Sequence, residues 1–163
     1  MGCREGGWRT EKRLAMSIEI RILRRDEGAI LANVAPDVFD DPIIRQVAEQ
    51  FLGDPRHHLA VAIDGNLVVG FASGVHYRHP DKLQPEFWIN EVGVAPAHQA
   101  QGLGKALMRA LLQVAQSLGC AEAWVLTERN NAPAIRLYKA IGGAEAPDET
   151  VMFTFHLDRT PST

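Results

Sequence analysis

The feature that most constrains this chain of 163 residues is a strand that leads through a glycine-containing turn into a long amphipathic helix. Residues Phe87 to Ala95 are predicted to form the strand, which Pro96 ends. Apolar residues then recur at helical spacing from Leu103 to Leu118, and Gly119 stands where a C-terminal cap belongs. A short apolar strand follows over residues 121–127. This strand–helix–strand order predicts a right-handed parallel crossover.

The rest of the chain places further elements around this crossover. Before it we predict a strand at Ser17–Leu23, a helix-leaning region at Asp26–Leu52, and a hairpin of strands His58–Ile63 and Leu67–Tyr77. After it we predict a helix that starts at Asn130 or Asn131, and a closing strand at Val151–Leu157. The order favours an α/β (α+β) fold with a mixed, mostly antiparallel sheet, a central parallel strand pair and flanking helices.

Length and composition favour one domain of ordinary globular type. We expect residues 16–163 to form this domain, and residues 1–15, which lack periodicity, to be a dispensable extension. A net charge of −3 argues against nucleic acid as a partner. No apolar run approaches the roughly 20 residues of a membrane span, so we expect no membrane partner. Cys3 and Cys120 lack metal-ligand or disulfide spacing, so we expect no metal site and a cytoplasmic location.

The turn between strand and helix is a candidate anion site, because a helix start exposes free backbone N–H groups at the positive end of its dipole. A P-loop would need Ser or Thr after Gly104-Lys105, where Ala106 stands, and a glycine at Gln99. A dinucleotide fingerprint would need a third glycine at Leu107. Neither pattern fits.

Two motifs resemble those of the GNAT superfamily of N-acetyltransferases. The first is Gln99-x-x-Gly102-x-Gly104 after a strand, which is similar to the family's Arg/Gln-x-x-Gly-x-Gly/Ala signature. The second is the segment 131–143, which resembles Asn-x-x-Ala-x-x-Leu-Tyr-x-x-x-Gly-Phe, with Gly143 in place of the Phe. Their order and spacing make the combined signal specific, and the resemblance extends from about Ser17 to Leu157.

The resemblance implies that acetyl-CoA is the donor. In the family, backbone N–H groups of the turn bind the CoA pyrophosphate, and the strand before it binds the pantetheine arm while splaying from its parallel neighbour. Carried over to this sequence, the strand positions are Val92 and Val94, and an N–H near Val94 would polarise the thioester carbonyl. Asn131 matches a position that often contacts pantetheine, and it is equally suited to cap a helix. The turn positions are Gln99, Ala100, Gln101, Gly102, Leu103, Gly104 and Lys105.

The resemblance also implies direct attack by a neutral amine. Amines of lysine-like pKa are mostly protonated at pH 7, so a base is needed. Glu91 is the first candidate base, with Glu86 and Asp148 as alternatives and a water relay as another route. Tyr138 matches the family's acid for the departing thiolate, and a structural role as a helix aromatic is its alternative.

A looser resemblance points to the acceptor. The segments 38–41, 59–70, 88–94 and 149–153 resemble the aminoglycoside 3-N-acetyltransferases of the GNAT type. This implies a small cationic amine as substrate, antibiotic resistance as the role, and a homodimer as one expected assembly. Another amine, such as a polyamine, an amino acid or a protein N-terminus, and a non-catalytic acyl-CoA-binding module remain alternatives. The predicted substrate-binding carboxylates are Asp40, Asp41, Glu86, Asp148 and Glu149, and Trp88 and Trp124 are predicted to lie in the core.

Overall fold

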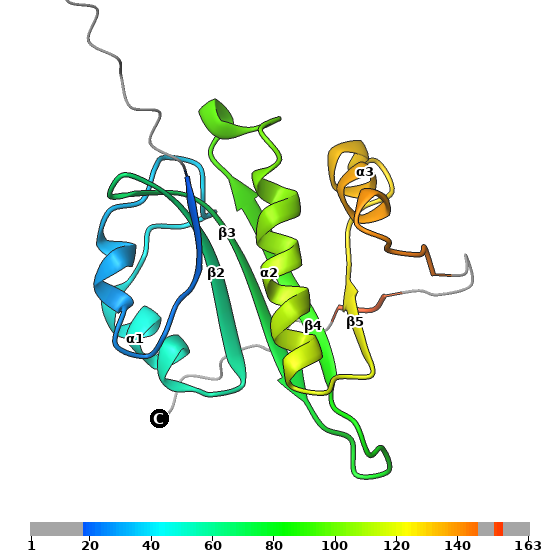
Figure 1. The fold of residues 1–163 in the computed structure, drawn as a ribbon. Coiled ribbons are helices and arrows are strands. Elements are labelled where there is room, and N and C mark those ends of the chain that lie inside the picture. Colours follow the sequence, from blue (N-terminus) through cyan, green and yellow to red (C-terminus); the bar gives the residue numbers. More distant parts are fainter. Residues whose placement is uncertain (1–17, 147–151, 155–163) are drawn as a thin grey trace, which may run out of the picture. The chain divides into compact units, whose positions relative to one another are not determined.

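The computed structural model describes residues 18–146 and 152–154, and the chain divides into two compact units, residues 1–127 and 128–163 (Figure 1). The second unit contains α3 (Ala132–Ala140). The first contains β1 (Glu19–Ile22), the 3₁₀ helix η1 (Gly28–Ala32), α1 (Arg45–Gly53), β2 (His57–Asp64), β3 (Leu67–Tyr77), β4 (Glu86–Val94), the 3₁₀ helix η2 (Pro96–His98), α2 (Leu103–Ser117) and β5 (Glu122–Val125).

The first unit is built on one five-stranded sheet of order β1-β2-β3-β4-β5. Neighbouring strands are antiparallel except β4 and β5, which are parallel and are joined through α2. This confirms the predicted mixed sheet and its parallel crossover. The β2–β3 hairpin closes at Gly65, whose φ of 65° lies in the left-handed region that a tight hairpin turn requires.

Helices cover both faces of this sheet. Helix α2 packs against all five strands on one face (Figure 1). On that face a Cβ at Gly70 would lie 3.3 Å from the Leu107 side chain of α2. The neighbouring residue Phe71 points to the opposite face, where its ring stacks on Phe39 at 3.8 Å between centroids. The segment from η1 to α1 therefore covers the second face, with α1 packed against η1 and β2.

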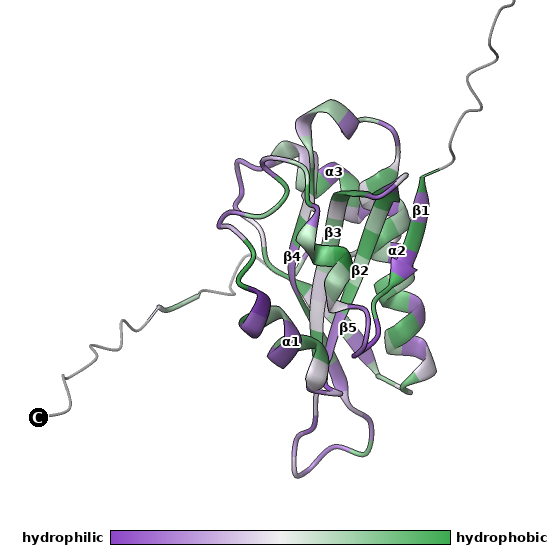
Figure 2. Ribbon diagram, turned by 90° about the vertical axis from the view of Figure 1, so that its left-hand side faces the viewer, coloured by the Kyte–Doolittle hydropathy of each residue, from purple (hydrophilic) through white to green (hydrophobic). Residues whose placement is uncertain are grey.

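The amphipathic pattern of α2 explains both its length and its place. Its buried residues are Leu103, Leu107, Met108, Leu111 and Ala115, which follow the helical period. Burying a leucine side chain contributes about 1.5–3 kcal/mol, so this stripe holds the helix on the sheet. The helix ends at the predicted place, because Gly119 adopts a φ of 71°. Figure 2 shows the matching hydrophobic residues along most of β2.

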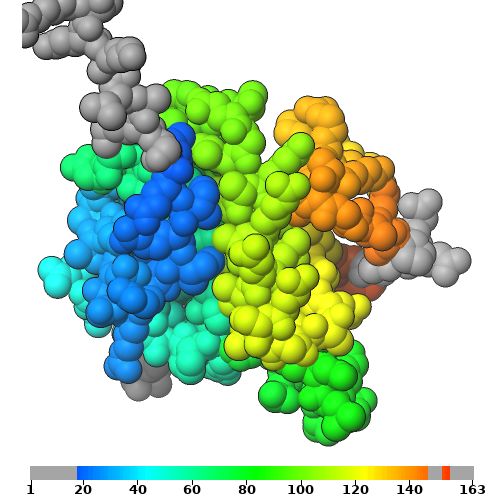
Figure 3. Space-filling model, in the orientation of Figure 1, coloured from blue at the N-terminus to red at the C-terminus, as the bar shows by residue number. Residues whose placement is uncertain are grey.

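Two parts of the first unit lie at its margins. The edge strand β1 lies beside α2, and a groove of about 510 Å³ between them is lined by Ile20, Ile22 and Arg109 among others. Figure 3 shows this face, with β1 in blue and α2 in yellow-green. The loop 78–85 between β3 and β4 forms the green projection in the same view, and Leu83 on it is 90% exposed.

The helix-leaning region 26–52 contains less helix than predicted. Only η1 and α1 form, and residues 33–44 between them are irregular. Pro36 and Pro42 lack the N–H that a helix needs. Val34 instead forms an isolated bridge with Val68, and Asp37 has a φ of 59°.

In the second unit, α3 has well-defined ends. The Asn131 side chain accepts a hydrogen bond from the Ala134 N–H at 3.2 Å, and Pro133 lies in the first turn. At the C-terminus the N–H of Gly143 donates to Tyr138 O, and the N–H of Gly142 donates to Lys139 O. This is the pattern of a Schellman cap, with Gly142 at a φ of 94°.

Two predictions concern residues that the structure describes only in part or not at all. Of the predicted closing strand, Met152–Thr154 are described and carry no strand, while Val151, Phe155 and Leu157 lie outside the described residues. The predicted N-terminal extension, residues 1–15, also lies outside them. Among the helices of the described ranges, none is long and apolar enough to cross a membrane.

Candidate active site

The sheet opens into a fork between β4 and β5. The two strands pair only from Glu86 to Ile89 on β4, with the last pair formed by Ile89 and Val125. Strand β4 continues to Val94 without β5 beside it. The register against β3 shifts at the same point, since Ser73 pairs with Glu91 and Gly74 with Ile89, so that Asn90 is an extra residue in a bulge.

Beyond the fork, the backbone of β4 offers hydrogen-bonding groups on its open side. The Ala95 N–H donates to Val69 O of β3 at 2.9 Å. Counting back from Ala95, every second residue therefore directs its N–H and C=O groups toward β3. In an antiparallel pair the intervening residues direct their N–H and C=O groups away from the partner. Val92 and Val94 are these residues, and they therefore face the gap that β5 has left.

The turn after β4 is closed by its own glutamine side chains. Gln99 donates from Nε2 to Val94 O at 3.0 Å, and Gln101 donates from Nε2 to Ala97 O at 3.3 Å. These two predicted cofactor-binding residues thus hold the turn against the end of the strand. Ala100 between them has a φ of 59°, which is uncommon for a residue with a Cβ.

The start of α2 is an open anion-binding position. Gly102 precedes the helix with a φ of 83°, offers no side-chain cap, and would meet nothing within 4 Å if it carried a Cβ. The N–H groups of Leu103, Gly104 and Lys105 have no intrahelical acceptor. No acidic residue lies in the first turn, whereas Lys105 does. These residues fit a diphosphate, which the N-terminal end of a helix attracts.

Glu91 lies on the other face of β4, opposite α2. It pairs with Ser73, and both line a cavity of about 270 Å³ with Phe39 and Phe71. Burial raises the pKa of the Glu91 carboxyl, and the nearby Asp40 carboxylate raises this pKa further. A carboxyl that solvent reaches and whose pKa is raised is suited to accept a proton from an amine.

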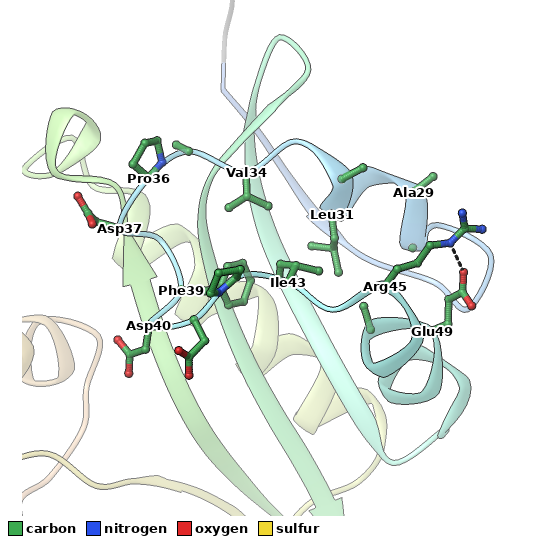
Figure 4. A pocket seen from close by; sticks show the side chains of 16 residues that line it. Ala29, Leu31, Val34, Pro36, Asp37, Phe39, Asp40, Ile43, Arg45 and Glu49 are labelled. Carbon is green, nitrogen blue, oxygen red and sulfur yellow. Dashed lines mark hydrogen bonds and ion pairs between the residues drawn. The ribbon is translucent and has the colours of Figure 1, made fainter.

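A second, larger cavity adjoins the first. It has a volume of about 700 Å³ and is lined by residues 28–49, including Asp37, Asp40 and Asp41. Figure 4 shows Asp37 and Asp40 at one end of it and Arg45 with Glu49 at the other. Arg45 Nε donates to Glu49 Oε1 at 2.7 Å, so the cavity is acidic mainly at the aspartate end.

A glycine brings the aspartate segment over β4. A Cβ at Gly93 would lie 2.2 Å from Val38 O and 2.7 Å from the Phe71 ring. Only a glycine allows the backbone before Asp40 to cross the strand this closely. The structure thus brings Asp40 close to Glu91, as the electrostatic effect on the Glu91 pKa indicates.

Glu86 lies at the opposite end of β4, and other side chains occupy its carboxylate. Lys82 binds Oε1, and the Tyr77 hydroxyl donates to Oε2 at 2.9 Å. Lys82 and then Tyr77 lower the pKa of Glu86. The Glu86 side chain is only 9% exposed.

The two tryptophans predicted to lie in the core are exposed, and that prediction is wrong. Trp88 is 38% and Trp124 is 36% exposed, and their rings stack at 5.3 Å with an interplanar angle of 6°. Both lie on the sheet face that α2 does not cover, where α1 does not extend to β5. Their place in neighbouring strands next to the fork is visible only in the tertiary structure.

The remaining predicted site residues lie in the second unit or outside the described residues. Burial raises the pKa of the Tyr138 hydroxyl, so this phenol keeps its proton at neutral pH. Asn131 caps α3, which was one of its two predicted roles. Asp148 and Glu149 lie outside the described residues. Within the described ranges, no group of three or more His, Cys, Asp or Glu side chains is placed to hold a metal ion.

The structure thus combines a strand fork, an open helix N-terminus beside it, and a carboxyl of raised pKa on the opposite face. Residues 22–142 match the acetyltransferase (GNAT) family. The chain therefore belongs to the GNAT family of acetyltransferases.

Curated relatives match parts of the chain. Streptothricin acetyltransferase of Streptomyces lavendulae is 35% identical over 91 residues, which are 56% of this chain and 46% of that protein. N-alpha-acetyltransferase RimI of Mycobacterium tuberculosis is 27% identical over 127 residues, which are 77% of each chain. The match thus spans less than half the length of the streptothricin enzyme and about three quarters of RimI.

Solved structures share the fold. An aminoglycoside acetyltransferase from an uncultured soil metagenomic sample, solved in complex with sisomicin, has a TM-score of 0.71 at 20% identity. The similarity covers 86% of this chain and 97% of that one. The aminoglycoside N-acetyltransferase AAC(6')-Iy in complex with CoA has a TM-score of 0.67 at 20% identity, with 86% and 95% covered. At 20% sequence identity, these similarities show a shared fold and nothing further.

Proposed function

We propose that this protein transfers the acetyl group of acetyl-CoA to an amine of a small polycationic acceptor, an aminoglycoside acetylated on an amine of its central ring. The observation that carries the proposal is the arrangement around β4. On its open edge lie the backbone groups of Val92 and Val94, and next to them the helix start at Gly102. On its other face lie Glu91 and the aspartate-lined cavity.

The donor would be held mainly by backbone groups. N–H groups of residues 102–105 would bind the diphosphate, with Lys105 adding charge. The backbone of Val92 and the N–H of Val94, whose C=O already accepts from Gln99, would pair with the amides of the pantetheine arm. Acetyl-CoA, when bound, supplies an acetyl group on a thioester carbon that a neutral amine can attack.

The protein side chains would manage the protons. Glu91 would accept a proton from the acceptor ammonium, because its raised pKa makes it a stronger base than an ordinary carboxylate. The amine nitrogen then forms a bond to the acetyl carbon and gives up a second proton to solvent as the carbon–sulfur bond breaks. The sulfur would receive a proton from Tyr138, which solvent would then reprotonate, a role assigned on the motif and compatible with the raised pKa of this phenol.

The acceptor class follows from charge. Asp37, Asp40 and Asp41 lie at one end of the large cavity, and a polycation is attracted by such a cluster. Glu86 has its oxygens engaged by Lys82 and Tyr77, so we assign it a supporting role on the acceptor face. Aminoglycoside acetyltransferases among the structural neighbours agree with this acceptor.

One observation favours a second acceptor, the N-terminal amine of a protein. The RimI match covers 77% of both chains, more than the streptothricin acetyltransferase match does. An acidic cavity would also attract a protonated peptide N-terminus.

The test is a panel of acceptors assayed for thiol release from acetyl-CoA. We expect gentamicin to be acetylated with a kcat/KM at least tenfold above that of spermidine or an alanine-terminated peptide. If only the peptide is acetylated, the acceptor is a protein N-terminus and not an aminoglycoside. Absence of heat on titration with acetyl-CoA in a calorimeter would refute the acetyltransferase proposal as a whole.

A further inference from the structure

A pair of exposed, stacked tryptophans lies next to the strand fork. Trp88 and Trp124 stack with ring centroids 5.3 Å apart, and each retains more than a third of its surface exposed. Tryptophan is usually highly buried, so two exposed indoles in contact need an explanation. The proposed chemistry has not used either side chain.

The strand register places this pair on the same face as Glu91. Trp88 pairs with Val75 and Glu91 pairs with Ser73, and Val75 and Ser73 are two residues apart on β3. Residues two apart on a strand point to one face. The bulge at Asn90 therefore keeps Trp88 and Glu91 on a common face, about 7 Å apart along the strand direction.

The pair also marks the point where the fork begins. Trp88 and Trp124 are direct partners in the parallel pairing, and the next pair, Ile89 with Val125, is the last. A group that emerges through the fork onto this face lies between the indoles on one side and Glu91 on the other.

A chain of hydrogen bonds fixes the indole of Trp124. Its Nε1–H donates to the Tyr77 hydroxyl at 2.8 Å, and this hydroxyl donates to Glu86 at 2.9 Å. Lys82 binds the other oxygen of Glu86, whose side chain is nearly buried. The orientation of the Trp124 indole is thus set by a carboxylate anchored within the sheet, and Trp88 stacks on this indole.

We propose that Trp88 and Trp124 form an aromatic floor of the acceptor site, which stacks on the weakly polar face of a saturated ring that carries the reacting ammonium. This inference rests on the proposed acetyl transfer and adds a selection for cyclic over acyclic polyamines. A ring above the indoles would place an amine on its rim close to Glu91, and indoles attract ammonium groups in addition. An acyclic polyamine has no ring face to stack.

The first test uses fluorescence. The sequence has three tryptophans, so a Trp8→Phe variant emits only from Trp88 and Trp124. We expect acrylamide to quench this emission efficiently in the free protein. With CoA present, gentamicin should change the emission saturably, and spermidine at equal charge concentration should not. Emission that acrylamide does not quench is the result expected if another part of the chain covers the indoles, and it would overturn the proposal.

The second test uses kinetics. Trp88→Leu should raise the KM for gentamicin about tenfold, change kcat less than twofold, and leave the KM values of spermidine and acetyl-CoA unchanged. Trp88→Phe should restore most of the affinity for gentamicin. Leu83→Ala removes an equally apolar side chain that is 90% exposed on the loop 78–85, and it should have no effect.

The outcomes separate this inference from the proposed function. If the parent protein acetylates amines but Trp88→Leu raises the KM of all acceptors equally or of none, the aromatic floor is refuted and acetyl transfer stands. If the parent acetylates no amine, both fail. Should Trp88→Leu not fold, Tyr77→Phe frees the Trp124 N–H while keeping a ring, and it should raise the KM of gentamicin but not that of spermidine. Equal KM values for both acceptors in Tyr77→Phe and the parent would then count against the proposal.

Discussion

Glu91 shows how one position on a strand can acquire the properties of a base. Its cavity removes part of the water that stabilises a carboxylate, and Asp40 adds a like charge. Both effects raise the pKa of the Glu91 carboxyl, and the larger effect is burial. A base of raised pKa still exchanges protons with solvent here, because Glu91 lines the cavity and is also exposed to solvent.

The contribution of Asp40 can be measured from the pH dependence of kcat/KM. Glu91 must be deprotonated to act, so activity should rise with pH through its pKa, which lies above the ordinary value of 4.5. Asp40→Asn removes the like charge, lowers the pKa of Glu91, and should move this acidic limb to lower pH. Asp26→Asn, on an exposed aspartate paired with Arg24, is the control and should leave the limb in place. A limb that stays fixed in Asp40→Asn would show that another group is the base.

Gly93 governs the path of the backbone that carries Asp40. Gly93→Ala would press a methyl group against Val38 O and the Phe71 ring, and neither can move without displacing a buried layer. Overpacking of this kind typically costs about 1–3 kcal/mol. We expect a matching loss in the free energy of unfolding from urea titration. The control is Gly53→Ala at the end of α1, where a Cβ would meet nothing within 4 Å. Equal stability of the two variants would contradict the close crossing.

At the scale of elements, α2 offers a matched pair of positions. Gly102 before the helix and Gly119 after it both have positive φ, and neither would meet an atom within 4 Å if it carried a Cβ. Alanine should therefore cost a similar backbone strain at both, about 1–2 kcal/mol. The ends differ in that only the first exposes N–H groups to a ligand.

This difference predicts separate effects on donor binding. Gly102→Ala should weaken acetyl-CoA binding about tenfold or more, because its methyl group would occupy space next to the free N–H groups. Gly119→Ala should bind acetyl-CoA like the parent, although its melting temperature falls by a similar amount. Calorimetric titration measures the affinities and thermal unfolding the stabilities. A parallel loss of affinity in both variants would indicate destabilisation rather than a diphosphate site.

The elements that the sequence predicts are those with a strong local cause. The apolar stripe of α2 with its end at Gly119, the β2–β3 hairpin and the N-terminal cap of α3 are all read from residues close in the sequence, and the structure has them. The path of residues 33–44 is not predictable from the local sequence, because it depends on Gly93 and on the bridge between Val34 and Val68.

The site was predictable to a similar degree. The open helix start and the residues of the turn follow from the motif. The bulge at Asn90 does not, since a single extra residue leaves the strand pattern of β4 almost unchanged while it alters which side chains share a face. Trp88 and Trp124 were misplaced for another reason, since their exposure depends on how far the helices extend over the sheet. The engagement of Glu86 by Lys82 and Tyr77 likewise depends on a contact across the hairpin.

At the scale of the whole molecule, the two proposed substrates carry opposite charges and meet different surfaces. The chain has a net charge of −3, yet Lys105 and the helix start are positive, while the cavity lined by Asp37, Asp40 and Asp41 is negative. Long-range attraction of the acceptor should therefore depend on a few carboxylates and on ionic strength.

Salt dependence tests this separation of charge. Raising the ionic strength from about 0.1 M to about 1 M shortens the Debye length from about 10 Å to about 3 Å. With acetyl-CoA kept saturating at each salt concentration, kcat/KM for gentamicin should fall on the order of tenfold, because steering of a polycation is screened. A monoamine acceptor should lose much less.

The double variant Asp40→Asn/Asp41→Asn assigns this effect to the cavity. It should show a lower kcat/KM for gentamicin at low salt and a shallower dependence on salt, so that it approaches the parent at high salt. Asp26→Asn/Asp81→Asn changes the net charge equally at two exposed positions outside the cavity lining and should keep the parent's slope. If both double variants flatten the slope to the same extent, the attraction comes from net charge alone, and the aspartate end of the cavity is not where the acceptor binds.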